Sequence, residues 1–111
     1  MSQRIIATTT PAVPGREVDQ VIDIVSAEVA VGMNIFKDIF SSVRDFVGGR
    51  AHSVQDTLRV LREQALEELR EEAARLGADA VVGVDLDYSE FSGGGKSMLF
   101  LVANGTAVRL R

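Results

Sequence analysis

The sequence feature that most constrains the fold is one long helical pattern that follows a pair of glycines and ends at another glycine. Its apolar residues recur at three- and four-residue steps and so share one helical face: Val54, Leu58, Leu61, Ala65, Leu69, Ala73 and Leu76. Ser53 is the predicted N-cap, and Gly77 is the predicted C-terminal end. In a chain of 111 residues, a helix of this length spans the whole folded unit.

A shorter amphipathic pattern precedes the long one. Asn34 can cap it, and its apolar face comprises Phe36, Ile39, Phe40, Val43, Phe46 and Val47. Gly48 and Gly49 then predict its end. The sequence therefore predicts two consecutive helices in the middle of the chain.

Strand patterns lie on both sides of these helices. A short apolar run predicts a strand over residues 5–9, and β-branched residues are abundant over residues 18–31. Within the second segment, Ala27, Val29 and Val31 alternate with small or polar residues, but the alternation slips at Ile24-Val25. We expect one long interrupted strand, or two short strands, ending at Gly32.

The C-terminal third has the pattern of a hairpin. Ala80, Val82, Val84, Leu86 and Tyr88 alternate with acidic or small residues, which predicts a strand with one apolar face. Residues 93–95 are three glycines that can connect it to a return strand over residues 98–111, whose centre is apolar on both faces. One sheet face covered by helices leaves the other without cover, and large exposed apolar patches are rare on monomers. The pattern therefore predicts self-association.

These elements define a single α+β domain over residues 1–111. The expected architecture is a small, mostly antiparallel sheet with two helices, in the order strand or strands, helix, helix, strand, strand. Hydrophobic residues make up 46% of the chain and charged residues 25%, values that suit a folded soluble domain.

Composition excludes several kinds of chemistry. The chain has no cysteine and one histidine, His52, so thiolate catalysis and thiolate metal sites are absent. A net charge of −4 with scattered basic residues gives no support for nucleic-acid or anionic-membrane partners. No apolar run is long enough to cross a bilayer, and the start of the chain lacks a signal-peptide pattern. A cytoplasmic location is expected.

Acidic residues form the best candidate metal site. Asp85 and Asp87 are two residues apart on a predicted strand, so they project from one face about 6 to 7 Å apart. Glu28 lies on another strand and can join them, and oxygen ligands suit hard divalent cations. The commoner role of such acids is to be solvated charges that discourage aggregation of a strand edge.

A second candidate site is an anion or cofactor site at Gly48, Gly49 and Arg50. Free backbone amides before a helix, beside a guanidinium, can bind an anion. The segment lacks a P-loop and a dinucleotide fingerprint, and a tight turn between helices explains it as well. His52 has no ligand-like partner nearby in the sequence, and no motif indicates an enzyme.

Several segments together resemble the YbjQ-like family of small bacterial and archaeal proteins. The resemblance spans nearly the whole chain from Ile5, in the same order and spacing. Its segments are residues 24–38, residues 45–50, residues 65–69, residues 76–88 and residues 103–108.

The resemblance implies a subunit similar to that of dodecin and a ring-shaped homopentamer. It also implies heavy-metal binding, which has been attached to the family without an established activity. This chain departs from that expectation, because soft metals prefer thiolate and imidazole ligands. We therefore expect a self-assembling protein that is not an enzyme and binds a metal ion or small ligand between subunits. The alternative is a structural or adaptor protein without a small ligand.

Overall fold

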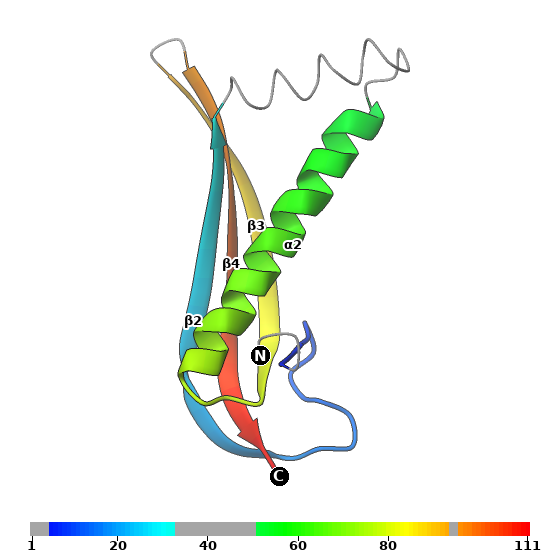
Figure 1. Cartoon of the computed structure of the whole chain (residues 1–111), viewed down its shortest axis with the longest axis vertical. Helices are drawn as coiled ribbons and strands as arrows, with labels where there is room; N and C mark the ends of the chain where they lie inside the picture. Colours follow the sequence, from blue (N-terminus) through cyan, green and yellow to red (C-terminus); the bar gives the residue numbers. More distant parts are fainter. Residues whose placement is uncertain (1–4, 33–50, 94–95) are drawn as a thin grey trace.

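The structure is a computed structural model that describes residues 5–32, 51–93 and 96–111 (Figure 1). Its elements follow one another as β1 (Ile6–Ala7), β2 (Val18–Gly32), α2 (Ala51–Arg75), β3 (Ala80–Gly93) and β4 (Lys96–Leu110). The strands form one sheet in the order β1-β3-β4-β2. The pair β1–β3 is parallel, and the pairs β3–β4 and β4–β2 are antiparallel.

The predicted α+β class is confirmed, with a mixed sheet of which only the two-residue β1 is parallel to its neighbour. The described residues contain one helix, where the sequence predicted two. The first predicted helix falls within residues 33–50, outside the residues that the structure describes. The predicted hairpin is confirmed, because β3 and β4 pair from Ala80↔Val108 to Gly93↔Lys96.

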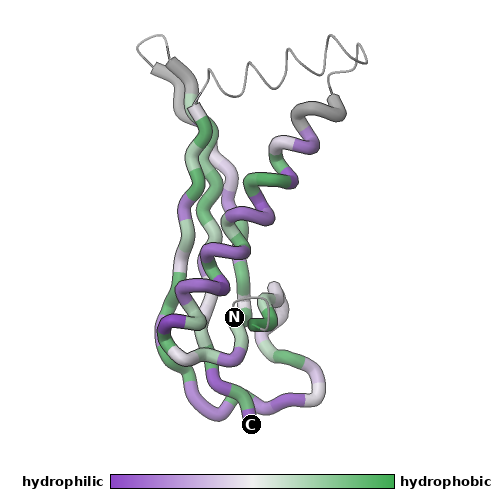
Figure 2. Tube along the Cα trace, in the orientation of Figure 1, coloured by the Kyte–Doolittle hydropathy of each residue, from purple (hydrophilic) through white to green (hydrophobic). Residues whose placement is uncertain are grey.

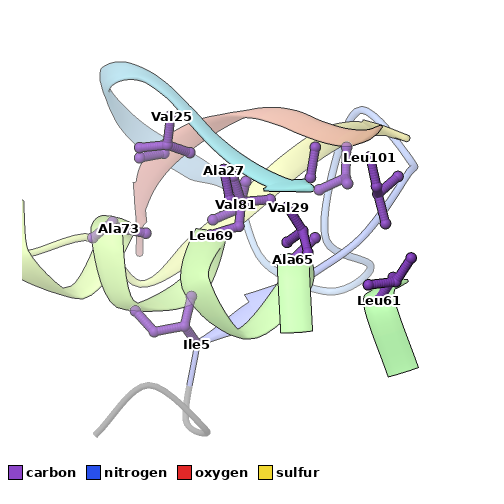
Figure 3. Close-up of a cluster of buried hydrophobic side chains, with 14 of the residues drawn as sticks. Ile5, Val25, Ala27, Val29, Leu61, Ala65, Leu69, Ala73, Val81 and Leu101 are labelled. Atoms are coloured by element: carbon purple, nitrogen blue, oxygen red, sulfur yellow. The ribbon is translucent and has the colours of Figure 1, made fainter. Parts of the chain in front are cut away.

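The helix α2 lies diagonally over one face of the sheet (Figure 1). Its buried positions recur at four-residue steps: Thr57, Leu61, Ala65, Leu69 and Ala73. The four apolar members of this set pack on Val25, Ala27 and Val29 of β2 and on Leu101 of β4, and together they form the main core (Figure 3). Two members of the predicted stripe differ, since Leu58 is half-buried and Leu76 is exposed beyond the helix end.

The end of α2 has the hydrogen bonds of a Schellman motif. The amide of Ala78 donates to the carbonyl of Ala73 and the amide of Gly77 donates to that of Ala74, both at 3.0 Å. Gly77 has φ 78°, a left-handed conformation in which a side chain is strained. The predicted helix end at Gly77 is confirmed.

The strand β2 follows the alternation expected from its sequence. Ala27, Val29 and Val31 are buried under α2, whereas Ser26 and Glu28 are exposed. The strand is continuous but irregular, with register shifts between Val18 and Gln20 and between Val21 and Asp23. These shifts precede the predicted slip at Ile24-Val25.

The strand β3 departs from its predicted alternation at Gly83. Its pairing with β4 shifts between Val82 and Asp85, and Gly83 has φ 62°. This bulge inserts a residue and reverses the faces beyond it, so Val84 joins Val81 in the main core while Val82 points the other way. The prediction that Ala80, Val82, Val84 and Leu86 share one face is wrong.

A smaller core lies on the sheet face opposite α2. Val13, from the segment between β1 and β2, packs on Ala80, Val82 and Val108. The same segment extends β3 at the bulge, where the amides of Gly83 and Val84 donate to the carbonyls of Thr10 and Thr8. The N-terminal segment therefore covers this end of the opposite face and satisfies the backbone groups that the bulge exposes.

Candidate functional site

The predicted metal ligands lie on the sheet face opposite α2. Directly paired residues of neighbouring strands share a face, and the pairings place Glu28, Val102 and Asp87 in one row across β2, β4 and β3. The next row consists of Ser26, Asn104 and Asp85. Because these positions are the neighbours of residues buried under α2, their side chains project away from the helix.

Asp85 and Asp87 interact directly. The carboxylate of Asp85 accepts a hydrogen bond from protonated Asp87 and repels its anionic form, and these two effects raise the pKa of Asp87 above its ordinary value of 3.8. A smaller contribution comes from loss of hydration. Both carboxylates are exposed. The pair is a local concentration of negative charge that favours a proton or a cation.

Glu28 does not adjoin this pair. The strand β4 separates its strand from that of Asp87, and Val102 lies between them in the row. Two strand spacings put their Cα atoms about 9.5 Å apart, so the two residues are not direct neighbours on the sheet. The described residues contain no group of three or more His, Cys, Asp or Glu residues that could hold a metal ion.

The structure gives less information about the predicted anion site and about His52. Gly48, Gly49 and Arg50 lie outside the residues that the structure describes, and the anion site stays a prediction. The helix α2 already includes Ala51, so His52 and Ser53 lie inside it, and the prediction of an N-cap at Ser53 is wrong.

One surface feature was missed from the sequence. A groove of about 350 Å³ lies between β2 and α2, and we call it the β2–α2 groove. It is lined by Ser26, Ala27, Glu28, Glu68, Glu71, Glu72 and Arg75. Glu68, Glu71 and Glu72 belong to α2, along which hydrophilic and hydrophobic stretches alternate (Figure 2). That these glutamates adjoin an outer strand of the sheet depends on the strand order.

The donor atoms available do not suit a heavy metal. Zinc, copper and cadmium favour sulfur and imidazole ligands, and the chain has no cysteine and a single histidine. The carboxylates of Asp85 and Asp87 are hard ligands that suit Ca²⁺ or Mg²⁺. A cation at this pair needs further ligands from water or from a second subunit.

Comparison with known proteins identifies the family. Residues 5–111 match the YbjQ family profile, which is described as "Putative heavy-metal-binding". The chain is 42% identical over 107 residues to UPF0145 protein PM1668 of Pasteurella multocida, and this alignment covers 96% of the chain and 100% of that protein. The chain belongs to this family, which confirms the resemblance found from its residues.

A solved structure supports the fold. A crystal structure of a protein with unknown function in the DUF74 family, from Pediococcus pentosaceus, superposes with a TM-score of 0.67. The match covers 96% of this chain and 98% of that one at 15% sequence identity, and it therefore concerns the fold alone. The names of these relatives state no enzymatic activity.

The helix α2 does not resemble a membrane span. Within the described parts of the chain, no helix is both long and apolar enough to cross a bilayer.

Proposed function

We propose that this protein is not an enzyme and assembles into a homopentamer through the sheet face opposite α2, which we call the open face. The observation that carries this proposal is that, among the residues that the structure describes, apolar side chains on that face are exposed. Ile24 is 76% exposed. It pairs with Thr106 of β4, which also pairs with Val82 of β3, so Ile24 lies on the same sheet face as the smaller core. The number of subunits rests on the family resemblance.

The apolar character of the open face continues along β4. Phe100 and Val102 share the face of Asp87 and Glu28, both are half-buried, and the one helix among the described residues, α2, lies on the other face. Ala30 adds to the same surface and is exposed. Association through this surface removes apolar area from water, at about 25 cal/mol for each Å² buried.

Native mass spectrometry combined with light scattering tests the assembly. We expect a five-fold mass for the wild-type protein and a monomer for Ile24→Lys, because a buried lysine at a subunit interface is strongly unfavourable. Val60→Lys is the matched control, since Val60 is an exposed apolar residue on α2, 59% accessible. A monomeric wild-type protein contradicts the proposal, as does an Ile24→Lys variant that keeps the wild-type mass.

The assembly offers a binding site for a divalent cation or small ligand. Asp85 and Asp87 lie on the open face, where a neighbouring subunit can supply the ligands that one chain lacks. Isothermal titration with Ca²⁺, Zn²⁺ and Cu²⁺ tests this site, and the heat should disappear in Asp85→Asn/Asp87→Asn and persist in Glu63→Gln. The predicted anion site is tested separately, by phosphate binding to Arg50→Ala.

A structural or adaptor role without a small ligand is the second candidate. It is favoured by the observation that the described residues of one chain bring no three possible metal ligands together. The two candidates differ in the mass of the untreated assembly. An added ion or ligand supports the binding role, and a bare five-fold mass supports the adaptor role.

A further inference from the structure

The outer edge of β2 is available for pairing. In the sheet order β1-β3-β4-β2, the 15-residue β2 is a terminal strand, and within the described chain no strand pairs with its outer side. In an antiparallel strand, alternate residues direct their N–H and C=O groups to opposite sides. Every second residue of β2 therefore presents a donor and an acceptor to the outside, an arrangement to which an extended segment can add as a further strand.

The β2–α2 groove lies along this edge. Residues 26–28 of β2 form one wall, and Glu68, Glu71, Glu72 and Arg75 of α2 form the other. On the α2 side, three glutamates and one arginine line the groove and give that wall an excess of two negative charges. An extended segment in the groove would have alternate side chains directed toward the glutamates of α2.

The ion pairs of α2 leave part of this charge uncompensated. Arg75 pairs with Glu72, and Glu68 accepts a hydrogen bond from Gln64. Glu71 has no ion-pair partner among the described residues. The groove therefore combines unpaired backbone groups with carboxylates that are open to a cation.

We propose that the β2–α2 groove binds an extended basic segment of a partner protein. The segment adds to the outer edge of β2 as a strand, and its lysine or arginine side chains on the helix side pair with Glu68 and Glu71. The backbone hydrogen bonds provide affinity without sequence preference, and the charge provides selection for basic segments.

A second copy of this chain is a poorer occupant. Pairing of two β2 edges would bring the α2 walls of both grooves together. Each wall has three glutamates and one arginine, so six carboxylates would face only two arginines. Pairing with the outer edge of β3 would add Asp85, Asp87 and Glu90, which are also acidic. Like charges in such proximity are unfavourable, so the groove disfavours self-pairing and favours a basic partner.

This inference goes beyond the proposed assembly, which uses the open face. The groove instead uses the outer edge of β2 and the polar side of α2. The groove variant carries substitutions only on α2, whereas its control carries one on α2 and one on β3, and the mass of each is measured alongside wild type. A variant that loses peptide binding but keeps the wild-type mass is therefore altered in the groove and not in the assembly.

The probe is a fluorescein-labelled peptide of about nine residues in which lysine and threonine alternate. Fluorescence anisotropy at low salt is expected to show binding that weakens as salt is added. The double variant Glu68→Gln/Glu71→Gln should bind the peptide about tenfold more weakly, whereas Glu63→Gln/Glu90→Gln should bind as wild type. The control removes the same charge from exposed positions outside the groove.

Two modified peptides test strand addition. Methyl groups on the amide nitrogens of alternate residues block one edge of the peptide, and moving them by one residue blocks the other edge. Strand addition predicts that only one of these two peptides binds. Equal binding of both, binding of a peptide with glutamate in place of lysine, or equal binding to both double variants overturns the proposal. Failure of the lysine peptide to bind overturns it too.

Discussion

Gly105 of β4 lies directly against Val81 of β3, so closely that a Cβ at position 105 would overlap Cγ1 of the valine. The same Cβ would be 3.2 Å from Cγ2 of Val84 and 3.3 Å from the carbonyl oxygen of Val82. These three residues surround the bulge at Gly83. The bulge turns Val84 into the main core, and the absence of a side chain at Gly105 makes the space for it.

Gly105→Ala should therefore destabilise the protein. Overpacking of a tight core costs about 1–3 kcal/mol, and here the overlap involves two buried valines whose backbone is paired. Urea unfolding followed by circular dichroism measures the change. Gly32→Ala is the control, because a Cβ at Gly32 meets nothing within 4 Å. Equal stability of the two variants would contradict the close approach.

Substitutions at Gly83 should destabilise for a different reason. A Cβ there has open space around it, but φ is +62°. An ordinary side chain in the left-handed region costs about 1–2 kcal/mol. We expect Gly83→Ala to lose about this amount and Gly83→Asn to lose less, because asparagine tolerates that conformation. The order of the two thermal unfolding temperatures is the test, and the reverse order would count against a strained backbone.

The pair Asp85 and Asp87 should make stability depend on pH. Since the folded state raises the pKa of Asp87 above 3.8, its stabilising contribution is complete below that value and is lost as the pH rises through the raised pKa. The variant Asp87→Asn has no carboxyl group at this position, so its stability does not fall with pH for this reason. The difference in unfolding temperature between the variant and wild type should therefore grow with pH across this window and then level off.

The cause can be checked by NMR titration of the Asp87 carboxyl carbon. Asp85→Asn should return the pKa of Asp87 toward 3.8, because the hydrogen bond to the Asp85 carboxylate is the largest cause of the shift and the charge of that carboxylate is the second. A pKa that does not change in Asp85→Asn would assign the shift to another cause.

Leu69→Ala should be the most damaging of these substitutions. Leu69 is fully buried where α2 meets β2, and truncation of a buried leucine costs about 2–5 kcal/mol. The matched control is Val60→Ala on the exposed side of the same helix, which should change the unfolding free energy by about 0.5 kcal/mol or less. Similar losses in both variants would show that α2 does not pack on the sheet as described.

Much of the architecture could be predicted from local patterns. The alternation around Val29 identified the buried face of β2, and Gly77 identified the end of α2, because both signals depend only on nearby residues. The pattern in β3 misled the prediction beyond Gly83, since the bulge depends on the N-terminal segment and on Gly105, both distant in sequence. The burial of Val13 could not be foreseen, because its flanking prolines and glycine indicate a turn.

The candidate sites were likewise predictable where they depend on local pattern and not where they depend on strand order. Asp85 and Asp87 were expected on one face, and they lie there because both follow the bulge and keep the two-residue period. The separation of Glu28 from the pair depends on strand order, which places β4 between their strands. The β2–α2 groove was missed for the same reason.

The sequence by itself determined the kinds of element, the buried side of α2 and β2, and the absence of soft metal ligands. These follow from side-chain chemistry and from repeats of two and about four residues along one segment. Only the tertiary structure decided which strand became the outer one, which face stayed open and which acids became neighbours. Those outcomes depend on pairings such as Glu28↔Val102↔Asp87, in which residues far apart in the chain must satisfy one another's backbone groups.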